Sequence, residues 1–155
     1  MAVLAGRVAL VTGASAGIGA GLAAMLAAEG AAVVLAARRE AELAGVADGI
    51  RQRGGVAIPV LTDLTSDESI ARLLATARAE AGPVDVLVNN AGYAVWKPLE
   101  ETAIAEWDHT FAVNVRAAAC RSAARNAGPA VRPDHQHRQR GRRGHRARPG
   151  RLLRQ

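Results

Sequence analysis

Short apolar runs alternate with longer amphipathic stretches through roughly the first 125 residues of this 155-residue chain. The runs at 8–11, 32–36, 56–61 and 84–88 have the length and the Val, Leu, Ile and Ala content of buried strands. The stretches that follow them carry apolar residues at helical spacing. Strands that alternate with helices in this way predict an α/β fold built on a parallel sheet.

The first two amphipathic stretches are predicted to form helices that end at glycines. Gly30 ends the first and Gly54-Gly55 ends the second, because glycine readily adopts the backbone conformation that terminates a helix. The apolar positions that follow helical spacing are Ile18, Leu22, Met25 and Leu26 in the first helix and Leu43, Val46, Ala47 and Ile50 in the second.

Two more helices are predicted downstream. Thr65-x-x-Glu68 has the form of a capping box and should begin a third helix, which Gly82-Pro83 then ends. A longer fourth helix should begin near Thr102. The apolar residues expected to face the core are Ile70, Leu73, Leu74 and Ala77 in the third helix and Ile104, Trp107, Phe111 and Val115 in the fourth.

The composition indicates one domain in a reducing, cytoplasmic setting. The chain has a single cysteine, Cys120, so it cannot form an internal disulfide. No apolar run approaches the roughly 18 residues that span a membrane, and no metal site is indicated. The net charge of +6 comes from residues 132–155, which hold nine arginines and one acidic residue, whereas the remainder has 11 basic and 13 acidic residues.

The segment Thr12-Gly-Ala-Ser-Ala-Gly-Ile-Gly19 joins the first predicted strand to the first predicted helix. Glycines at this spacing permit a sharp turn, let backbone amides approach a phosphate and let the helix pack close to the strand. A helix N-terminus also offers unpaired N–H groups and a partial positive charge. The segment therefore predicts a dinucleotide site, with Gly13, Gly17, Ile18 and Gly19 as candidate binding residues; a glycine turn without a ligand is the alternative.

Together with Asn89-Asn90-Ala91-Gly92, the TGxxxGxG spacing resembles the short-chain dehydrogenase/reductase family, classical type, over about residues 5–125. The resemblance implies a Rossmann-like, doubly wound parallel sheet, here incomplete, with strand order 3-2-1-4. By this resemblance, the chain divides into a nucleotide-binding domain at 1–128 and an Arg-rich tail at 129–155. The resemblance also places Asn90, Ala91 and Gly92 against the riboses of the cofactor, although a purely structural turn is possible too.

The residues after the second strand favour NADP over NAD. Ala37 occupies the position where an acidic residue would accept a hydrogen bond from the 2′-hydroxyl of NAD, and Arg38 and Arg39 follow it. A guanidinium pairs well with a 2′-phosphate, and Ser15 could add a hydroxyl to the same phosphate. The alternative is that both arginines are the solvated start of a helix.

The resemblance assigns two further positions. Asp63 would accept a hydrogen bond from the adenine amino group, assisted by the backbone of Leu64; a cap at the entry to the third helix is the alternative role for Asp63. Asn114 corresponds to the helical asparagine that, in the family, supports the catalytic lysine through water. Asn114 is the only member of the catalytic set that the resemblance finds in this chain.

Tyr93 and Lys97 imitate the missing catalytic pair. The family uses a tyrosine as general acid/base, a lysine four residues later and an upstream serine, and it transfers hydride between the nicotinamide and a carbonyl. Such a pair must share a helix face, yet Tyr93 and Lys97 precede Pro98 in a predicted loop. No serine lies at the required distance upstream, and we reject the pair as an active site.

The tail from 129 to 155 lacks apolar periodicity and is expected to be disordered. Codons that encode residues 135–142 can, when read one base later, encode Ile-Asn-Ile-Gly-Ser-Val-Ala-Gly, which resembles the serine-bearing strand of the family. We therefore hypothesise that the tail is a frameshifted reading of a reductase gene. Nucleic-acid binding by this basic segment is the less favoured interpretation, because it has neither lysine nor stacking aromatics.

The sequence thus predicts an NADP-dependent oxidoreductase of a carbonyl or secondary alcohol, of which this chain retains mainly the cofactor-binding half. The alternative functions are a non-catalytic nucleotide-binding protein and a basic-tailed nucleic-acid binder. Full-length relatives form homo-oligomers, but the surfaces that pair them are in doubt here. The exposed strand edge and helix faces that would remain predict a tendency to aggregate.

Overall fold

The computed structural model describes residues 2–118. The predictions for Cys120 and for the tail at 129–155, including its disorder and its frameshifted origin, lie outside these residues. Four parallel strands form one sheet in the order β3-β2-β1-β4, which confirms the predicted fold class and strand order. The strands are β1 (Val8–Thr12), β2 (Ala32–Ala37), β3 (Val56–Leu61) and β4 (Val86–Val88).

The fourth strand is shorter than predicted, because the Asp85 side chain rather than a backbone carbonyl accepts the hydrogen bond from Val8 N–H. The Asp85 carboxylate accepts a hydrogen bond from Val8 N–H at 2.9 Å, and Asp85 N–H donates to Val8 C=O at 2.9 Å. Arg7 adds a hydrogen bond to the same carboxylate at 2.9 Å. Regular pairing with β1 therefore begins at Val86 rather than at residue 84.

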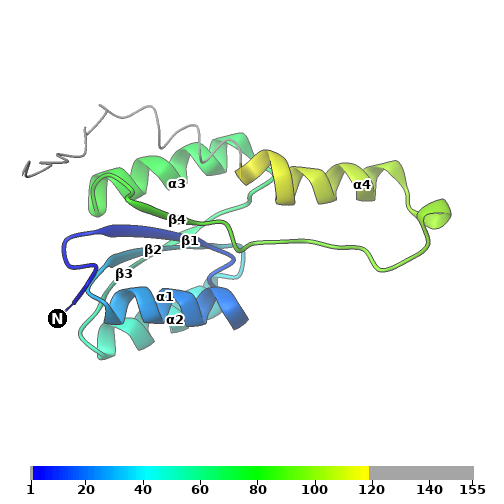
Figure 1. Ribbon diagram of the computed structural model, residues 1–155. Coiled ribbons are helices and arrows are strands. Elements are labelled where there is room, and N and C mark those ends of the chain that lie inside the picture. Colours follow the sequence, from blue (N-terminus) through cyan, green and yellow to red (C-terminus); the bar gives the residue numbers. More distant parts are fainter. Residues whose placement is uncertain (1, 119–155) are drawn as a thin grey trace, which may run out of the picture.

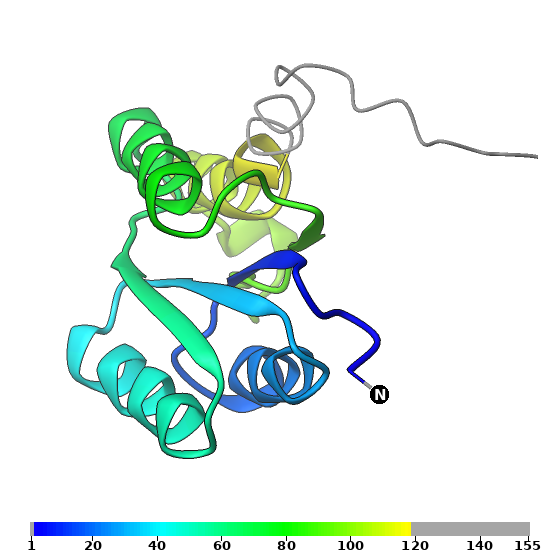
Figure 2. The same cartoon turned by 90° about the vertical axis from the view of Figure 1, so that its left-hand side faces the viewer.

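Helices cover both faces of the sheet. Helices α1 (Gly17–Ala28) and α2 (Glu40–Gln52) lie on one face, and α3 (Asp67–Glu80) lies on the other (Figures 1 and 2). Alternate residues of β1 enter opposite cores: Val11 packs with the α1 and α2 side and Leu10 with the α3 side. Burial on both faces explains why the central strands are continuously apolar.

The buried face of α1 differs from the predicted one. Ile18 and Met25 are 76% and 67% exposed, whereas Gly19, Ala23 and Ala27 are buried. These small residues lie at intervals of four and allow the helix to approach the sheet closely. Ile18 and Met25 therefore face solvent, and the other two predicted core residues, Leu22 and Leu26, are only partly buried.

The predicted capping box at the start of α3 is also wrong. Ser66, not Thr65, caps the helix, and its hydroxyl accepts a hydrogen bond from Ser69 N–H at 3.2 Å. The Thr65 hydroxyl instead donates to Asp63 at 2.8 Å. The predicted core face of this helix is correct, because Ile70, Leu73 and Ala77 are buried.

After β4 the chain runs beyond the sheet in an extended segment, and α4 (Ile104–Phe111) returns toward it (Figure 1). A short 3-10 turn, η1 (Leu99–Glu101), precedes α4, and a π-helical turn, η2 (Ala112–Arg116), follows it. The apolar residues of α4 do not face a core, contrary to the prediction. The predicted face runs from α4 into η2 and contains Ile104, Trp107, Phe111 and Val115, each at least 46% exposed within residues 2–118.

Each helix in the described part of the chain is too short or too polar to span a membrane.

Candidate nucleotide-binding site

The turn from β1 into α1 leaves the start of α1 open to an anion. Gly13 and Gly17 have φ values of +67° and +56°, which only glycine adopts without strain. Ala16 occupies the N-cap position and provides no side-chain hydrogen bond, and the first turn of α1 has no acidic residue. Each of the other three α-helices in the described part of the chain has at least one acidic residue in its first turn. The partial positive charge at the start of α1 is therefore not offset by an acidic side chain of its own first turn.

The same turn is packed too tightly for larger residues. A Cβ atom on Gly19 would lie 2.3 Å from Gly13 O, and a Cβ atom on Gly13 would lie 2.9 Å from Ala91 Cα. No heavy atom lies within 4 Å of the corresponding position on Gly17. Gly19 and Gly13 therefore allow the turn to pack against the helix and the end of β4. Gly17 leaves open space at the start of the helix.

Thr12 and Asn90 fasten the glycine turn to the end of β4. The fully buried Thr12 hydroxyl accepts hydrogen bonds from Asn90 N–H at 3.2 Å and from Ala91 N–H at 3.1 Å. The Asn90 side-chain amide donates to Thr12 C=O at 2.9 Å and to Gly13 C=O at 3.3 Å. The turn at 90–92 therefore has the structural role that the sequence analysis gave as an alternative, because it ties the ends of β1 and β4 together.

A cavity of about 340 Å³ lies at the carboxyl ends of the strands. Its volume is within the range of roughly 300–1,000 Å³ that is typical of small-molecule sites. Most of the predicted cofactor-binding residues line it. They are Gly13, Ser15, Arg38, Arg39, Asp63, Leu64, Asn90, Ala91 and Gly92. Gly17, Ile18, Gly19 and Asn114 are not part of the lining.

Arg38 and Arg39 lie where β2 meets α2, on the rim of the cavity. Nη2 of Arg39 donates to the Ser15 hydroxyl at 3.1 Å, which joins the glycine turn to the end of β2. Nη1 of Arg39 lies 3.3 Å from a carboxylate oxygen of Glu42, in the first turn of α2. Ala37, which precedes both arginines, brings no acidic side chain to this end of the cavity.

Asp63 lines the same cavity as the two arginines. One of its oxygens accepts hydrogen bonds from Thr65 N–H at 2.9 Å and from the Thr65 hydroxyl. These two bonds lower the pKa of the Asp63 carboxyl, and the charge of Arg38 lowers it further. Asp63 therefore carries a negative charge at neutral pH. Its interpretation as the helix cap is wrong, because Ser66 has that role.

The Asn114 side chain bonds to the extended segment after β4. Its oxygen accepts a hydrogen bond from Tyr93 N–H at 2.9 Å, and its amide donates to Tyr93 C=O at 2.8 Å. Asn114 lies in the π-helical turn η2, and such turns often occur at functional sites. The side chain thus holds the backbone that borders the cavity in place.

Comparison with known proteins identifies the family. Residues 7–128 match the family model described as short chain dehydrogenase. The chain belongs to the short-chain dehydrogenase family. It is 42% identical over 118 residues to a short chain dehydrogenase of Pseudocercospora fijiensis, an alignment that covers 75% of this chain and 38% of that protein.

Solved structures share the fold. A metagenomic short-chain oxidoreductase in complex with NADP is 43% identical, with a TM-score of 0.75 over 78% of this chain and 55% of that one. A metagenomic blue fluorescent protein in complex with NADPH is 32% identical, with a TM-score of 0.77 over 81% of this chain and 52% of that one. The chain therefore spans about half the length of these structures, or less in the case of the fungal relative.

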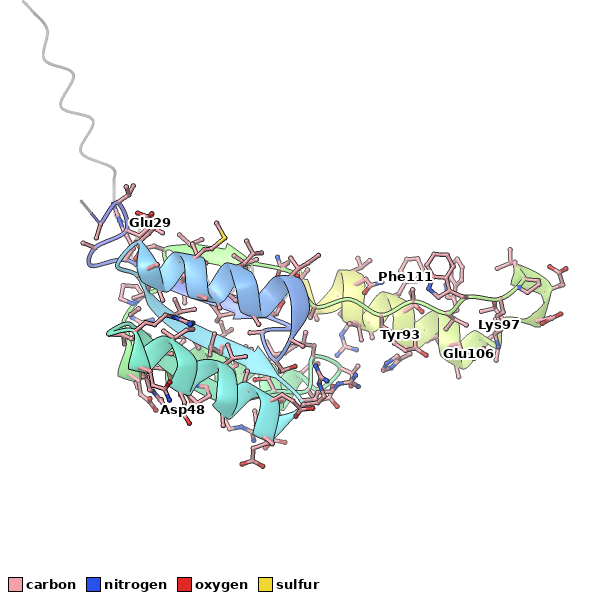
Figure 3. All side chains as sticks on the ribbon, turned by 90° about the horizontal axis from the view of Figure 1, so that it is seen from below. Glu29, Asp48, Tyr93, Lys97, Glu106 and Phe111 are labelled. Atoms are coloured by element: carbon pink, nitrogen blue, oxygen red, sulfur yellow. The ribbon has the colours of Figure 1, made fainter. Side chains whose placement is uncertain are left out.

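Tyr93 and Lys97 do not share a helix. Both lie in the irregular segment between β4 and η1, so they share no helix face. Lys97 forms an ion pair with Glu106, which lowers the pKa of that carboxyl (Figure 3). The Tyr93 ring packs edge-on against His109, with ring centroids 4.6 Å apart. The loop position predicted for both residues is therefore confirmed.

The sequence did not identify every residue of the site. Ala36, Tyr93 and Val113 also line the cavity, and Thr12 organises the turn behind it. Val113 could have been found from its position beside Asn114. Thr12 belongs to the glycine motif, but its hydroxyl partners are 78 and 79 residues away and cannot be read from local spacing.

Proposed function

We propose that residues 2–118 bind NADP(H), and that the reaction served is hydride transfer between this cofactor and a carbonyl or secondary alcohol in a cytoplasmic setting. The observation that carries the proposal is the convergence of three features on one cavity. These features are the glycine turn that leads into the acid-free start of α1, which lines the cavity through Gly13 and Ser15, the Arg38-Arg39 pair and the turn at 90–92. The NADP and NADPH complexes of two structural relatives support it.

The residues present fit the parts of such a cofactor. The open space over Gly17 and the uncapped start of α1 suit a pyrophosphate. Arg38, Arg39 and Ser15 suit a 2′-phosphate, because guanidinium groups form strong, charge-assisted hydrogen bonds to phosphate. Asp63, with Leu64 beside it, suits the adenine amino group. Bound NADPH would supply the hydride, and the turn at 90–92 would hold the adjoining riboses.

Chemistry beyond cofactor binding needs a proton donor beside the carbonyl. Among residues 2–118 the sole tyrosine and lysine are Tyr93 and Lys97, which are engaged with His109 and Glu106. Asn114 supports the cavity wall and brings no acidic proton. We therefore expect this chain to bind NADP without appreciable turnover of carbonyl substrates.

Isothermal titration of the full chain with NADP and NAD tests the proposal. The wild-type protein should bind NADP at least about tenfold more tightly than NAD, since a charge-assisted hydrogen bond contributes about 1.5–3 kcal/mol. Arg38→Gln and Arg39→Gln should each weaken NADP binding and leave NAD binding nearly unchanged. Arg53→Gln is the matched control, because this arginine is exposed at the opposite end of α2. Equal affinity of the wild-type protein for both cofactors would refute the NADP preference.

A further inference from the structure

The guanidinium of Arg39 is held between two side chains from different elements. Its Nη2 donates to Ser15 Oγ at 3.1 Å, in the glycine turn. Its Nη1 lies 3.3 Å from Glu42 Oε1, in the first turn of α2. Arg39 and Ser15 line the cavity, whereas Glu42 does not. A carboxylate outside the cavity therefore binds the cation that the cavity presents to a ligand.

A ligand phosphate on Arg39 would meet this carboxylate. Both anions would bind N–H groups of one planar guanidinium, which places them within a few ångströms of each other. The Arg39 and Glu42 side chains are 56% and 48% exposed, so solvent reduces their attraction and any repulsion between the anions. The effect of Glu42 on phosphate binding should consequently be modest and unfavourable.

The orientation of Arg39 does not depend on Glu42 alone. The Ser15 hydroxyl holds the other terminal nitrogen and remains in place when Glu42 is changed. Removal of the Glu42 charge should therefore leave Arg39 positioned over the cavity and free one set of N–H donors. A residue that only positioned the arginine would have the opposite effect, because its removal would weaken phosphate binding.

We propose that Glu42 is an internal competitor for the 2′-phosphate and lowers the affinity of Arg39 for it. The proposal rests on the NADP binding proposed above and assigns a specificity-determining role to a residue outside the cavity. Glu42 weakens the binding of ligands that carry the 2′-phosphate and does not change the affinity for ligands that lack it.

The test is calorimetric titration of Glu42→Gln at low ionic strength with NADP, adenosine 2′,5′-bisphosphate and NAD. NADP and the bisphosphate should bind about threefold more tightly than to the wild-type protein, which corresponds to an exposed ion pair. NAD binding should not change. Glu40→Gln is the matched control, because Glu40 begins the same helical turn and makes no ion pair with Arg39. In an Arg39→Gln background, Glu42→Gln should have no effect.

The outcomes separate this inference from the proposed function. An equal gain in Glu40→Gln and Glu42→Gln would show a general field effect and overturn the competitor role. Weaker NADP binding by Glu42→Gln would overturn it too, because Glu42 would then support the arginine. If the wild-type protein prefers NADP but Glu42→Gln binds NADP no more tightly, this inference fails while the proposed function stands. Equal binding of NADP and NAD by the wild-type protein defeats the proposed function first.

Discussion

At the scale of single residues, Thr12 connects the two ends of the binding site. Its fully buried hydroxyl accepts two backbone N–H groups, from Asn90 and Ala91, and donates to Val88 C=O at 3.3 Å. These bonds align the end of β1 with the end of β4. The position of the turn at 90–92 therefore depends on a side chain that need not touch a ligand.

Thr12→Val should destabilise the protein by about 1–3 kcal/mol, because it leaves two partly buried backbone donors without this partner. Thr62→Val is the matched control: its hydroxyl is also buried but makes one bond, to Val60 C=O at 2.9 Å. We expect a loss of about 1 kcal/mol or less in the control. Urea unfolding measures both, and equal losses in the two variants would show that the Thr12 bonds carry no special weight.

The residues that the sequence predicted well are those whose role follows from local backbone needs. Gly13 and Gly17 adopt the positive φ angles that the motif implies. Arg39 and Ser15 lie beside each other, as their expected shared phosphate requires. The Arg39–Glu42 contact was not predicted, because an exposed i, i+3 pair in a helical turn resembles many ion pairs without function.

At the scale of elements, the sequence located the helices and the buried faces of α2 and α3 but misjudged those of α1 and α4. Spacing alone could not show that the small residues of α1 contact the sheet, because its large and its small apolar residues both recur at helical spacing. For α4, the predicted apolar face exists, but no element of residues 2–118 packs on it. Trp107 and Phe111 stack on each other there, with ring centroids 4.9 Å apart.

The exposed face of α4 should promote self-association. Phe111→Glu should reduce light scattering at high protein concentration, because it places a charge within the apolar stripe. Met25→Glu is the matched control, since Met25 is an exposed apolar residue of another helix and lies outside the stripe. Scattering by Phe111→Glu that equals that of the wild-type protein would contradict this view of α4. The β4 edge would then be the better candidate, since in the described sheet β4 pairs only with β1.

At the scale of the whole molecule, the strand order decides where the site lies. In the order β3-β2-β1-β4 the chain leaves β1 toward β2 and later returns to the other side of β1 for β4. Ligands of open α/β sheets bind where the order reverses in this way, at the carboxyl ends of the strands. The glycine turn, the arginine pair and the turn at 90–92 all follow carboxyl ends of strands, so the fold itself brings them together (Figure 1).

Backbone amide NMR of the ¹⁵N-labelled full chain during titration with NADP tests this placement most directly. The largest shift changes should fall on the amides of residues 13–19, 38–39, 63–64 and 90–92. Amides at the opposite ends of the strands, such as Gly30 and Gly55, should not respond. Changes centred on those distant amides, or no changes at millimolar NADP, would contradict the account of this cavity as the cofactor site.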